Sequence, residues 1–471
     1  MKRTVKRLAL ALTAILVLYL AAVVVPYALP AEVDPDFWAG FSASDFYGDG
    51  SLSGPDRACY VGDPQQAFTL RLALIASAEE RIDISSYSTA AGETTALFWG
   101  ALLDAADRGV QVRVVLDAMF CGLGGSEEAT AAALWSHPNV ELYYFNPFSL
   151  LRPGAINSRL HDKYFIVDGK LLLLGGRNIA DNYFAPDSYE GAVSYDHDVL
   201  VWRSGRGESV IDDVLRYCDS VCANELTAPA FDRLSSRQLS RAETRGGELR
   251  ALYAACSVPE APTDEELLAM TAPTDKISLI SNPVTAEKKQ PLILAQLLAL
   301  ASQTDGAVLF QSPYTVLGRD ARRDFLALTE EREVGLLTNS LASTPNPPAF
   351  SAYLWDRTAL ARSGLSIYEY QSRDSIHGKA AFIGDRLTAV GSWNLDERSI
   401  YIDTEVMLVI DSAPFQQQML DELADITAQC LVVGPDGEYL PGDVEPLDVS
   451  LAKRAFYHGL SALTHLLAFL I

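Results

Sequence analysis

One pattern of polar residues occurs twice in the chain, and this duplication limits what the chain can fold into. The two copies are His161-Asp162-Lys163 followed by Gly175 and Asn178, and His377-Gly378-Lys379 followed by Gly391 and Asn394. In both copies the glycine lies 14 positions and the asparagine 17 positions after the histidine. With ordinary composition, three shared residue types at fixed offsets have odds of roughly one in ten thousand. Two equivalent half-sites therefore predict a duplicated domain with one active site built from both halves.

Each copy has the pattern of a β-hairpin with polar residues at one end. Residues two apart in a strand share a face, so the histidine and the lysine of a copy point the same way. In the first copy an apolar run leads to the turn Asp168-Gly169, and residues 171–174 return as a second strand. Asp385 lies in the corresponding turn of the second copy. The returning strand is expected to place the asparagine beside the histidine.

The residue types of the two half-sites suit a phosphodiester. The lysine ammonium and the asparagine amide of each copy can hold non-bridging oxygens as charge builds in the transition state. One imidazole can attack phosphorus covalently while the other protonates the leaving alcohol. An imidazole can fill either role near neutral pH because its unperturbed pKa is about 6.5. This chemistry requires no metal and no organic cofactor, and we expect neither.

A carboxylate behind each imidazole would fix its tautomer and stabilise the imidazolium. Glu405, in an apolar strand-like context, and Asp198, at a comparable position in the first half, are the predicted partners. Ser392 is expected to donate to phosphate. Arg177 can either hold a lipid phosphate or pair with a carboxylate, and the sequence leaves both open. Arg159 is expected to be a surface charge.

These residues resemble the HxK(x)4D signature of the phospholipase D superfamily, and within it they are most similar to bacterial cardiolipin synthases. The segments that carry the resemblance are residues 159–163 with 175–181 and residues 377–379 with 391–399, supported by 105–113, 311–314 and 338–344. The resemblance spans about residues 60–445. In the second motif the aspartate is displaced by one place to Asp385. Because the family aspartate lies in a turn, activity is expected to survive this change.

The resemblance implies a fold and a mechanism. Each repeat is expected to be a mixed sheet flanked by helices, with the repeats packed about a pseudo-twofold axis. A phospholipid such as phosphatidylglycerol would form a covalent phosphatidyl-histidine, which the hydroxyl of a second lipid or water then resolves. By analogy His161 is the nucleophile and His377 the general acid and base, although the likeness of the halves allows the reverse.

The expected function is thus that of a phosphatidyltransferase. Hydrolysis of phospholipid to phosphatidic acid is the nearest alternative, followed by a nucleic-acid phosphodiesterase and a non-catalytic lipid-binding relic. The net charge of −24 argues against nucleic acid as a partner, because such a surface repels a polyanion. Anionic lipid would be repelled as well, so an enzyme acting on lipid needs a tether to the bilayer.

The amino terminus predicts such a tether. Four basic residues among positions 2–7 precede an apolar stretch over residues 8–29, about the ~20 residues that span a bilayer. Because basic flanks stay in the cytoplasm, a single-pass anchor would place the catalytic domains outside it, at the cell membrane. A cleaved signal peptide is the rival, since residues 28–31 resemble a weak processing site. The apolar carboxyl end, after residue 454, is expected to lie in the membrane interface or to dock on the core.

Alternating helical and strand patterns in both halves predict an α/β fold. The predicted helices and strands alternate at residues 67–78, 82–86, 94–107 and 110–117 in the first half, and at 291–302, 307–311, 320–331 and 334–339 in the second. The predicted divisions are 1–30 (transmembrane anchor), 31–57 (juxtamembrane linker), 58–223 (first repeat), 224–274 (inter-repeat region), 275–445 (second repeat) and 446–471 (apolar carboxyl-terminal helix). The six cysteines permit up to three disulfides in an extracytoplasmic domain.

Overall fold

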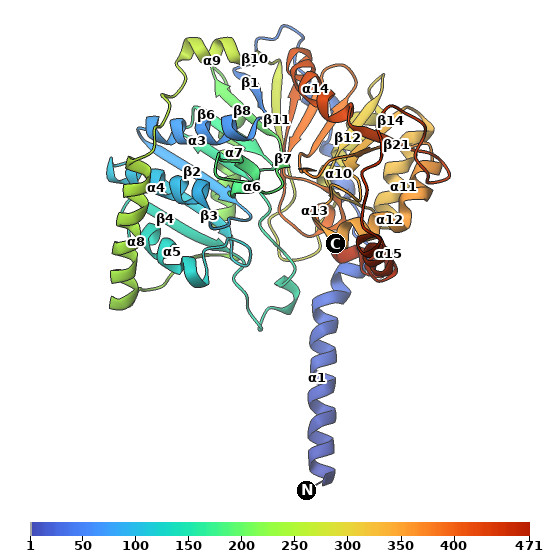
Figure 1. Ribbon diagram of the computed structural model, residues 1–471, viewed down its shortest axis with the longest axis horizontal. Helices are drawn as coiled ribbons and strands as arrows, with labels where there is room; N and C mark the ends of the chain where they lie inside the picture. Colours follow the sequence, from blue (N-terminus) through green and yellow to red (C-terminus); the bar gives the residue numbers. More distant parts are fainter. Residues whose placement is uncertain (1) are drawn as a thin grey trace.

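The chain folds into two α/β halves, each with one large mixed β-sheet (Figure 1). The computed structural model describes residues 2–471. The first half contains β1 (Asp56–Val61), α3 (Pro64–Ser77), β2 (Arg81–Ser86), α4 (Glu93–Asp107), β3 (Gln111–Asp117), α5 (Glu128–Trp135), β4 (Val140–Phe145), β5 (Tyr164–Val167), β6 (Leu171–Gly175), α6 (Asp181–Phe184), β7 (Ser194–Tyr195), β8 (Asp198–Arg203) and α7 (Val210–Cys222). The connection to the second half contains β9 (Thr227–Pro229), α8 (Ser236–Ala254), α9 (Asp264–Met270) and β10 (Ala272–Pro273).

The second half repeats this succession. It contains β11 (Lys276–Ser281), α10 (Leu292–Ser302), β12 (Val308–Gln311), β13 (Thr315–Val316), α11 (Arg319–Ala327), β14 (Val334–Asn339), α12 (Pro347–Arg362), β15 (Ser366–Tyr370), β16 (Ser375–Ile376), β17 (Ala380–Ile383), β18 (Leu387–Gly391), β19 (Leu395–Asp396), α13 (Glu397–Tyr401), β20 (Val406–Asp411), α14 (Ala413–Thr427), β21 (Cys430–Val433) and α15 (Leu451–Leu466). The alternating helices and strands predicted from the sequence pattern are confirmed in both halves.

The two sheets have the same strand order. The first runs β10-β1-β8-β6-β5-β2-β3-β4-β9 and the second β11-β20-β18-β17-β12-β14-β15-β21. Apart from the added edge strand β10, each strand of one sheet has a counterpart in the other, so the duplication seen in the motifs extends to the whole fold. The strands that carry the two motifs, β5 and β17, lie at equivalent positions in the middle of their sheets.

The motif hairpins form as the turn chemistry predicts. β5 and β6 pair antiparallel, and the Lys170 amide donates to the Val167 carbonyl across the turn. Asp168 and Gly169 both have positive φ, 51° and 61°, which is the geometry of a two-residue hairpin turn. The Asp168 carboxylate also accepts the amides of Glu80 and Arg81, and this fixes the turn against the start of β2. The turn role predicted for Asp168 is therefore confirmed, and Asp385 likewise lies in the turn between β17 and β18.

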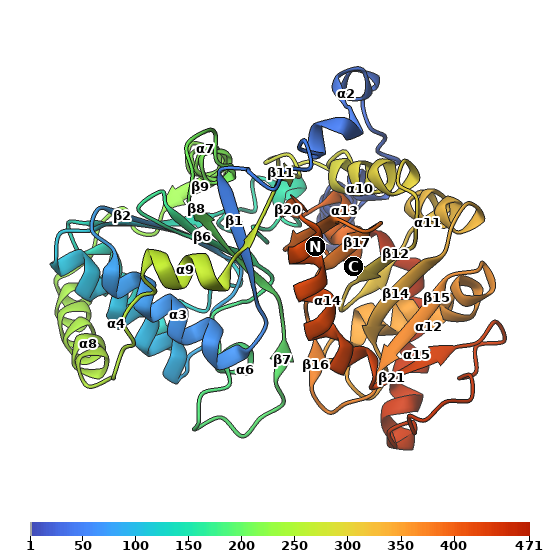
Figure 2. The same ribbon diagram turned by 90° about the horizontal axis from the view of Figure 1, so that it is seen from above.

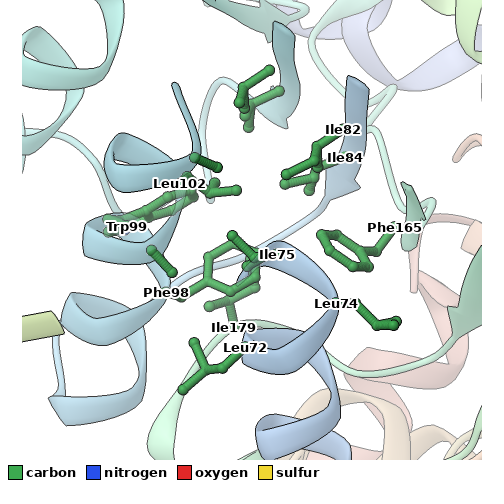
Figure 3. Close-up of a cluster of buried hydrophobic side chains, with 14 of the residues drawn as sticks. Leu72, Leu74, Ile75, Ile82, Ile84, Phe98, Trp99, Leu102, Phe165 and Ile179 are labelled. Carbon is green, nitrogen blue, oxygen red and sulfur yellow. The ribbon is translucent and has the colours of Figure 1, made fainter. Parts of the chain in front are cut away.

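Helices cover both faces of the first sheet, as the view from above shows (Figure 2). Figure 3 shows the apolar core between this sheet and α3 and α4, with Phe98 and Trp99 facing Ile82, Ile84 and the ring of Phe165 on β5. These side chains are almost completely shielded from water. Tyr164 and Ile166 on the other face of β5 are buried in a second apolar cluster, so the motif strand is anchored on both faces and its polar end projects toward the second half.

The two halves are joined through backbone pairs as well as apolar packing. β7 of the first half pairs parallel with β16 of the second, and Leu160 forms a parallel bridge with Thr404. One buried apolar cluster combines side chains of β6 and β8 in the first half with those of β18 and β20 in the second. The halves therefore form one continuous body whose junction runs directly beside both histidines.

The amino-terminal helix α1 (Lys2–Ala28) extends away from both halves (Figure 1). In the part of the chain that the structure describes, one helix is long and apolar enough to cross a membrane, Arg3–Ala28, with a mean hydropathy of 2.8. None of its most apolar window is buried against protein. After it, residues 31–57 are partly structured: Ala43 and Phe46 are buried in the core of the second half.

The carboxyl-terminal helix α15 has two different faces. Tyr457, Ser461 and Thr464 are buried, and the helix packs on α12. Leu463 and Leu466 are 55% and 72% exposed. Docking on the core, one of the two alternatives drawn from the sequence, is therefore confirmed for one face only.

No disulfide forms among the described residues, because all six cysteines are free thiols. Four of them, Cys59, Cys121, Cys218 and Cys430, are buried. Of the three disulfides that the cysteine count permits, this structure contains none among its described residues. Cys218 and Cys222, one turn apart on α7, lie close enough for their thiols to interact but are not bonded to each other.

Candidate active site

The first half-site is His161, at the end of the loop that leads into β5. Its Nδ1 lies 2.8 Å from Oε1 of Glu405, which immediately precedes β20 of the other half. The hydroxyls of Ser392 and Ser399 both donate to this carboxyl group. A ring held through Nδ1 presents Nε2 as its reactive nitrogen, so Glu405 has the tautomer-fixing position predicted for a partner carboxylate.

The second half-site repeats this geometry with the halves exchanged. Nδ1 of His377 lies 2.5 Å from Oδ2 of Asp196, which lies between β7 and β8 of the first half. Backbone bonds reinforce both pairs across the junction: the His377 amide donates to the Tyr195 carbonyl at 2.6 Å, and the Thr404 amide donates to the Arg159 carbonyl at 2.9 Å. Each histidine therefore depends on a carboxylate from the opposite repeat.

The prediction that Asp198 supports a histidine is wrong. Its carboxylate instead binds Arg71 at 3.0 Å and Arg177 at 2.8 Å. The strand register explains the error. Gly175 lies opposite Asp198, whereas the equivalent Gly391 lies opposite Met407, two positions beyond Glu405.

Counting back two positions from Asp198 gives Asp196 as the true counterpart of Glu405. The first half has a longer connection before β8 than the second has before β20, and this length difference hid the equivalence. Alignment of the apolar residues of β8 with those of β20 would have revealed it.

Three further residues considered in the sequence analysis contact other protein groups. Arg177 is buried and pairs with Asp198, so the structure supports the carboxylate alternative over a lipid phosphate. Ser392 was expected to donate to phosphate, but it is buried and donates to Glu405, which places it behind the ring. Arg159 is not a surface charge: it is 3% exposed and lies 3.5 Å from a carboxylate oxygen of Asp117.

The two motif lysines are buried beside their own histidines. The Lys163 ammonium donates to the His161 carbonyl at 2.5 Å, and Lys379 donates to the carbonyl of His377. Burial lowers the pKa of Lys163 to about 7 and that of Lys379 to about 8. Positive charge on these groups is therefore costly until an anion such as a phosphodiester enters.

Both asparagines face the space between the histidines. Asn178 and Asn394 are buried, and the Oδ1 atom of each has no hydrogen-bond partner among the described residues. Buried polar atoms of this kind are uncommon in folded proteins and are found where a ligand supplies the missing partner. These oxygens can accept a hydrogen bond from a substrate hydroxyl, whereas only the NH2 group of each amide can donate to a phosphate oxygen.

One cavity of about 770 Å³ brings the two half-sites together. His161, His377, Asn178 and Asn394 all line it. Aromatic rings form its walls: Tyr87 lies edge-on to the ring of His161, and Tyr183 and Tyr314 lie edge-on to the ring of His377. Among residues 2–471 no cluster of three or more histidine, cysteine and carboxylate side chains is arranged to hold a metal ion.

The two carboxylates differ in charge. Burial raises the pKa of Glu405 to about 8, so it is largely protonated at neutral pH. Burial acts on Asp196 in the same direction, but the charge of Lys379 and the hydrogen bond to His377 outweigh it and hold its pKa below the ordinary value. Burial also lowers the pKa of both imidazoles, to about 4 for His377 and well below 6.5 for His161. Both rings are thus neutral before an anion binds.

Comparison with known proteins agrees with this arrangement. A family model described as "Cardiolipin synthase, PLD-like domain" matches residues 72–202 and again 297–427, one match in each half. The chain belongs to this family. It is an enzyme of the phospholipase D superfamily, and the duplicated domain predicted from the sequence corresponds to the two matches.

Two relatives match this chain over most of their own length. Cardiolipin synthase C of Escherichia coli K12 is 30% identical over 402 residues, which cover 74% of this chain and 80% of the relative. An uncharacterised protein of Helicobacter pylori 26695 is 26% identical over 412 residues and 79% of each chain. The crystal structure of phosphatidylserine synthase from Haemophilus influenzae Rd KW20 has the same fold, with a TM-score of 0.62 at 14% identity over 92% of this chain and 100% of that one.

Proposed function

We propose that this family member is a membrane-anchored phosphatidyltransferase that forms cardiolipin or a related diphosphatidyl lipid. The observation that carries the proposal is the single cavity lined by two histidines, each backed by a carboxylate from the opposite half. Such a site has two imidazoles facing one substrate, one to attack phosphorus and one to transfer a proton, which is what a two-step displacement needs. The curated cardiolipin synthases among the relatives support a lipid substrate.

In the first step Nε2 of His161 attacks phosphorus and forms a P–N bond. The P–O bond to the headgroup breaks, and His377 gives its proton to the departing alkoxide, so that glycerol leaves if the donor is phosphatidylglycerol. Entry of the negatively charged phosphodiester beside Asp196 favours the protonated form of His377 that this step requires. The asparagine amides and the motif lysines stabilise the extra negative charge on the non-bridging oxygens.

In the second step the hydroxyl of an acceptor lipid attacks phosphorus while His377 removes its proton. The P–N bond breaks and His161 is restored. A second phosphatidylglycerol as acceptor gives cardiolipin, and water gives phosphatidic acid. The ionised Asp196 beside His377 supports the acid and base role for that ring, while the largely neutral Glu405 beside His161 leaves that ring uncharged for attack.

The test is product analysis with the purified full-length protein and phosphatidylglycerol vesicles. Cardiolipin and free glycerol in equal amounts support transfer. Phosphatidic acid alone means that water is the acceptor and that the chain is a hydrolase. Absence of both products with an intact, folded protein would contradict the proposed lipid substrate.

The anchoring part of the proposal is supported by the exposed apolar helix α1 and by the basic residues at its amino end. We propose that α1 spans the cell membrane once, with both catalytic halves outside the cytoplasm. Protease treatment of intact spheroplasts tests this orientation: cleavage of the catalytic halves supports it, and protection contradicts it. The mass of the purified chain distinguishes a retained anchor from a cleaved signal peptide.

A further inference from the structure

An exposed apolar loop lies between β4 and β5 of the first half. Phe148, Leu150 and Leu151 are 63%, 65% and 93% exposed. Three large apolar side chains within four positions form a patch that water solvates poorly, and such patches mark surfaces that contact a partner or a membrane. Figure 1 shows this loop, which follows β4, projecting toward the same side of the molecule as α1.

The loop is attached to the last turns of α1. The hydroxyl of Tyr27 donates to the Gly154 carbonyl at 2.6 Å, and the side-chain amide of Asn157 donates to the Val23 carbonyl at 2.8 Å. Val23 lies within the apolar part of α1, about 7 Å along the helix axis from its end at Ala28. If α1 spans a bilayer, the loop therefore lies at the depth of the lipid headgroups and the upper acyl chains.

The second half presents an apolar surface on the same side. The exposed face of α15 carries Leu463 and Leu466, and the adjoining Leu467 is 40% exposed. Figure 1 shows α15 beside the upper end of α1, on the side opposite α9. An exposed apolar helix face of this kind is suited to lie in a membrane interface.

Residues next to both surfaces line the catalytic cavity. Ile156, which follows the apolar loop, lines the cavity on the first half, together with the exposed side chains of Met119 and Phe120. Leu470 and Ile471, which follow α15, line it on the second half. The apolar surface thus continues from each half to the edge of the cavity that holds the two histidines.

We infer that the loop of residues 147–152 and the exposed face of α15 insert into the outer part of the same phospholipid bilayer that α1 spans. This docking seats the cavity mouth on the headgroups, so that a lipid phosphate reaches the histidines while its acyl chains stay in the membrane. The partner is a lipid bilayer because the loop is bound to a helix of membrane-spanning length. The inference rests on the proposed anchoring, and it adds a second and a third contact that hold the catalytic halves against the surface.

Fluorescence quenching tests the contact without any need for turnover. The full-length protein carrying Leu151→Trp is reconstituted into vesicles of phosphatidylglycerol and phosphatidylcholine with brominated acyl chains. The matched control is Leu268→Trp, at a leucine of α9 that is 54% exposed. Figure 1 shows α9 at the end of the molecule away from α1. We expect added quenching, relative to the unsubstituted protein, from Leu151→Trp and none from Leu268→Trp. Equal quenching in both variants, or none in either, would overturn the inference.

Turnover by two forms of the substrate provides an independent measurement. Leu151→Asp is expected to lower turnover of phosphatidylglycerol in vesicles by about tenfold, because a carboxylate opposes insertion, while turnover of monomeric short-chain phosphatidylglycerol stays within about twofold. Leu268→Asp should change neither. Unchanged vesicle turnover in Leu151→Asp, or an equal loss on both substrates, contradicts docking. If the unsubstituted protein makes no lipid product but quenching follows the expected pattern, the proposed chemistry fails and the docking surface stands.

Discussion

The two half-sites share a backbone plan but differ in the groups behind the imidazoles. Behind His161, the longer side chain of Glu405 is buried and accepts hydrogen bonds from two serine hydroxyls. It is largely protonated at neutral pH. Behind His377, the shorter Asp196 lies near Lys379 and stays ionised. The carboxyl group therefore keeps its position in both copies, but burial and neighbouring charge give the two carboxyl groups different protonation states. The difference assigns unequal tasks to two rings that look alike in sequence.

The two halves also differ in the residues that lie behind these carboxyl groups. At Gly176 an added Cβ would lie 2.3 Å from a carboxylate oxygen of Asp196, whereas the equivalent Ser392 fits and donates to Glu405. The buried ion pair of Arg177 with Asp198 is replaced in the second half by the apolar residues Trp393 and Met407 of its core. Trp393 is 3% exposed and thus has a packing role.

The largest expected effect comes from removing either histidine. His161→Asn and His377→Asn should each lower phosphatidyl transfer to background, because both a nucleophile and a proton donor are needed. Phosphatidyl-p-nitrophenol separates the roles, since p-nitrophenolate leaves without a proton. We expect a burst of p-nitrophenol from His377→Asn and none from His161→Asn. The opposite pattern would reverse the assignment, and near-full transfer by either variant would mean that the halves work independently.

The carboxylates should matter unequally. Asp196→Asn removes a negative charge that stabilises the imidazolium of His377, and we expect kcat to fall by about 10³-fold or more. Glu405→Gln replaces a largely neutral group and should lower kcat by only about 10- to 100-fold. Steady-state kinetics on short-chain phosphatidylglycerol measure both, with KM nearly unchanged. Equal losses would show that both carboxyl groups act as anions.

The ion pair and its apolar counterpart should differ in their effect on stability. Asp198→Asn leaves Arg71 and Arg177 without their shared carboxylate and should cost about 3–5 kcal/mol. Met407→Leu at the equivalent position keeps size and polarity and should cost less than about 1.5 kcal/mol. Thermal unfolding in detergent measures both variants. A cost for Asp198→Asn as small as that of Met407→Leu would contradict a structural role for the ion pair.

The smallest effect is a pH dependence of opposite sign in the two half-sites. The pKa of Glu405 in the folded chain is raised to about 8, whereas the unfolded chain ionises this group near pH 4.5. The free energy of unfolding therefore falls as pH rises from about 4.5 to about 8. Glu405→Gln should therefore gain stability relative to the unsubstituted chain over that range. Asp196 has a lowered pKa, so its contribution is present above pH 4 and is lost below it, and Asp196→Asn should lose stability at neutral pH. Melting temperatures at pH 2, pH 5 and pH 8 check both signs; a constant difference between pH 5 and pH 8 for Glu405→Gln would mean that Glu405 is ionised throughout.

Much of the fold, and the histidines, lysines and asparagines of the site, could be predicted from short sequence patterns. The repeated offsets of His, Lys, Gly and Asn predicted the duplication, and the turn at Asp168-Gly169 predicted the hairpin that brings Asn178 back to His161. These features are local because a two-residue turn fixes strand pairing within a short segment. Asp196 escaped prediction because an insertion shifts its place in the sequence, and the pairing of Gly175 with Asp198 reveals its equivalence to Glu405.

By itself the sequence determined the repeat, the hairpins, the polar ends of the motif strands and an apolar amino-terminal helix. The packing of the two halves decides that each imidazole takes its carboxylate from the opposite half. It also decides that Ser392 and Arg177 lie behind the cavity, whereas the buried Arg159 lines it. The physical reason is that periodicity fixes which face of a strand a residue occupies. Which distant strand packs against that face depends on how the two sheets meet, and the charge of a buried carboxylate depends on the neighbours that this meeting supplies.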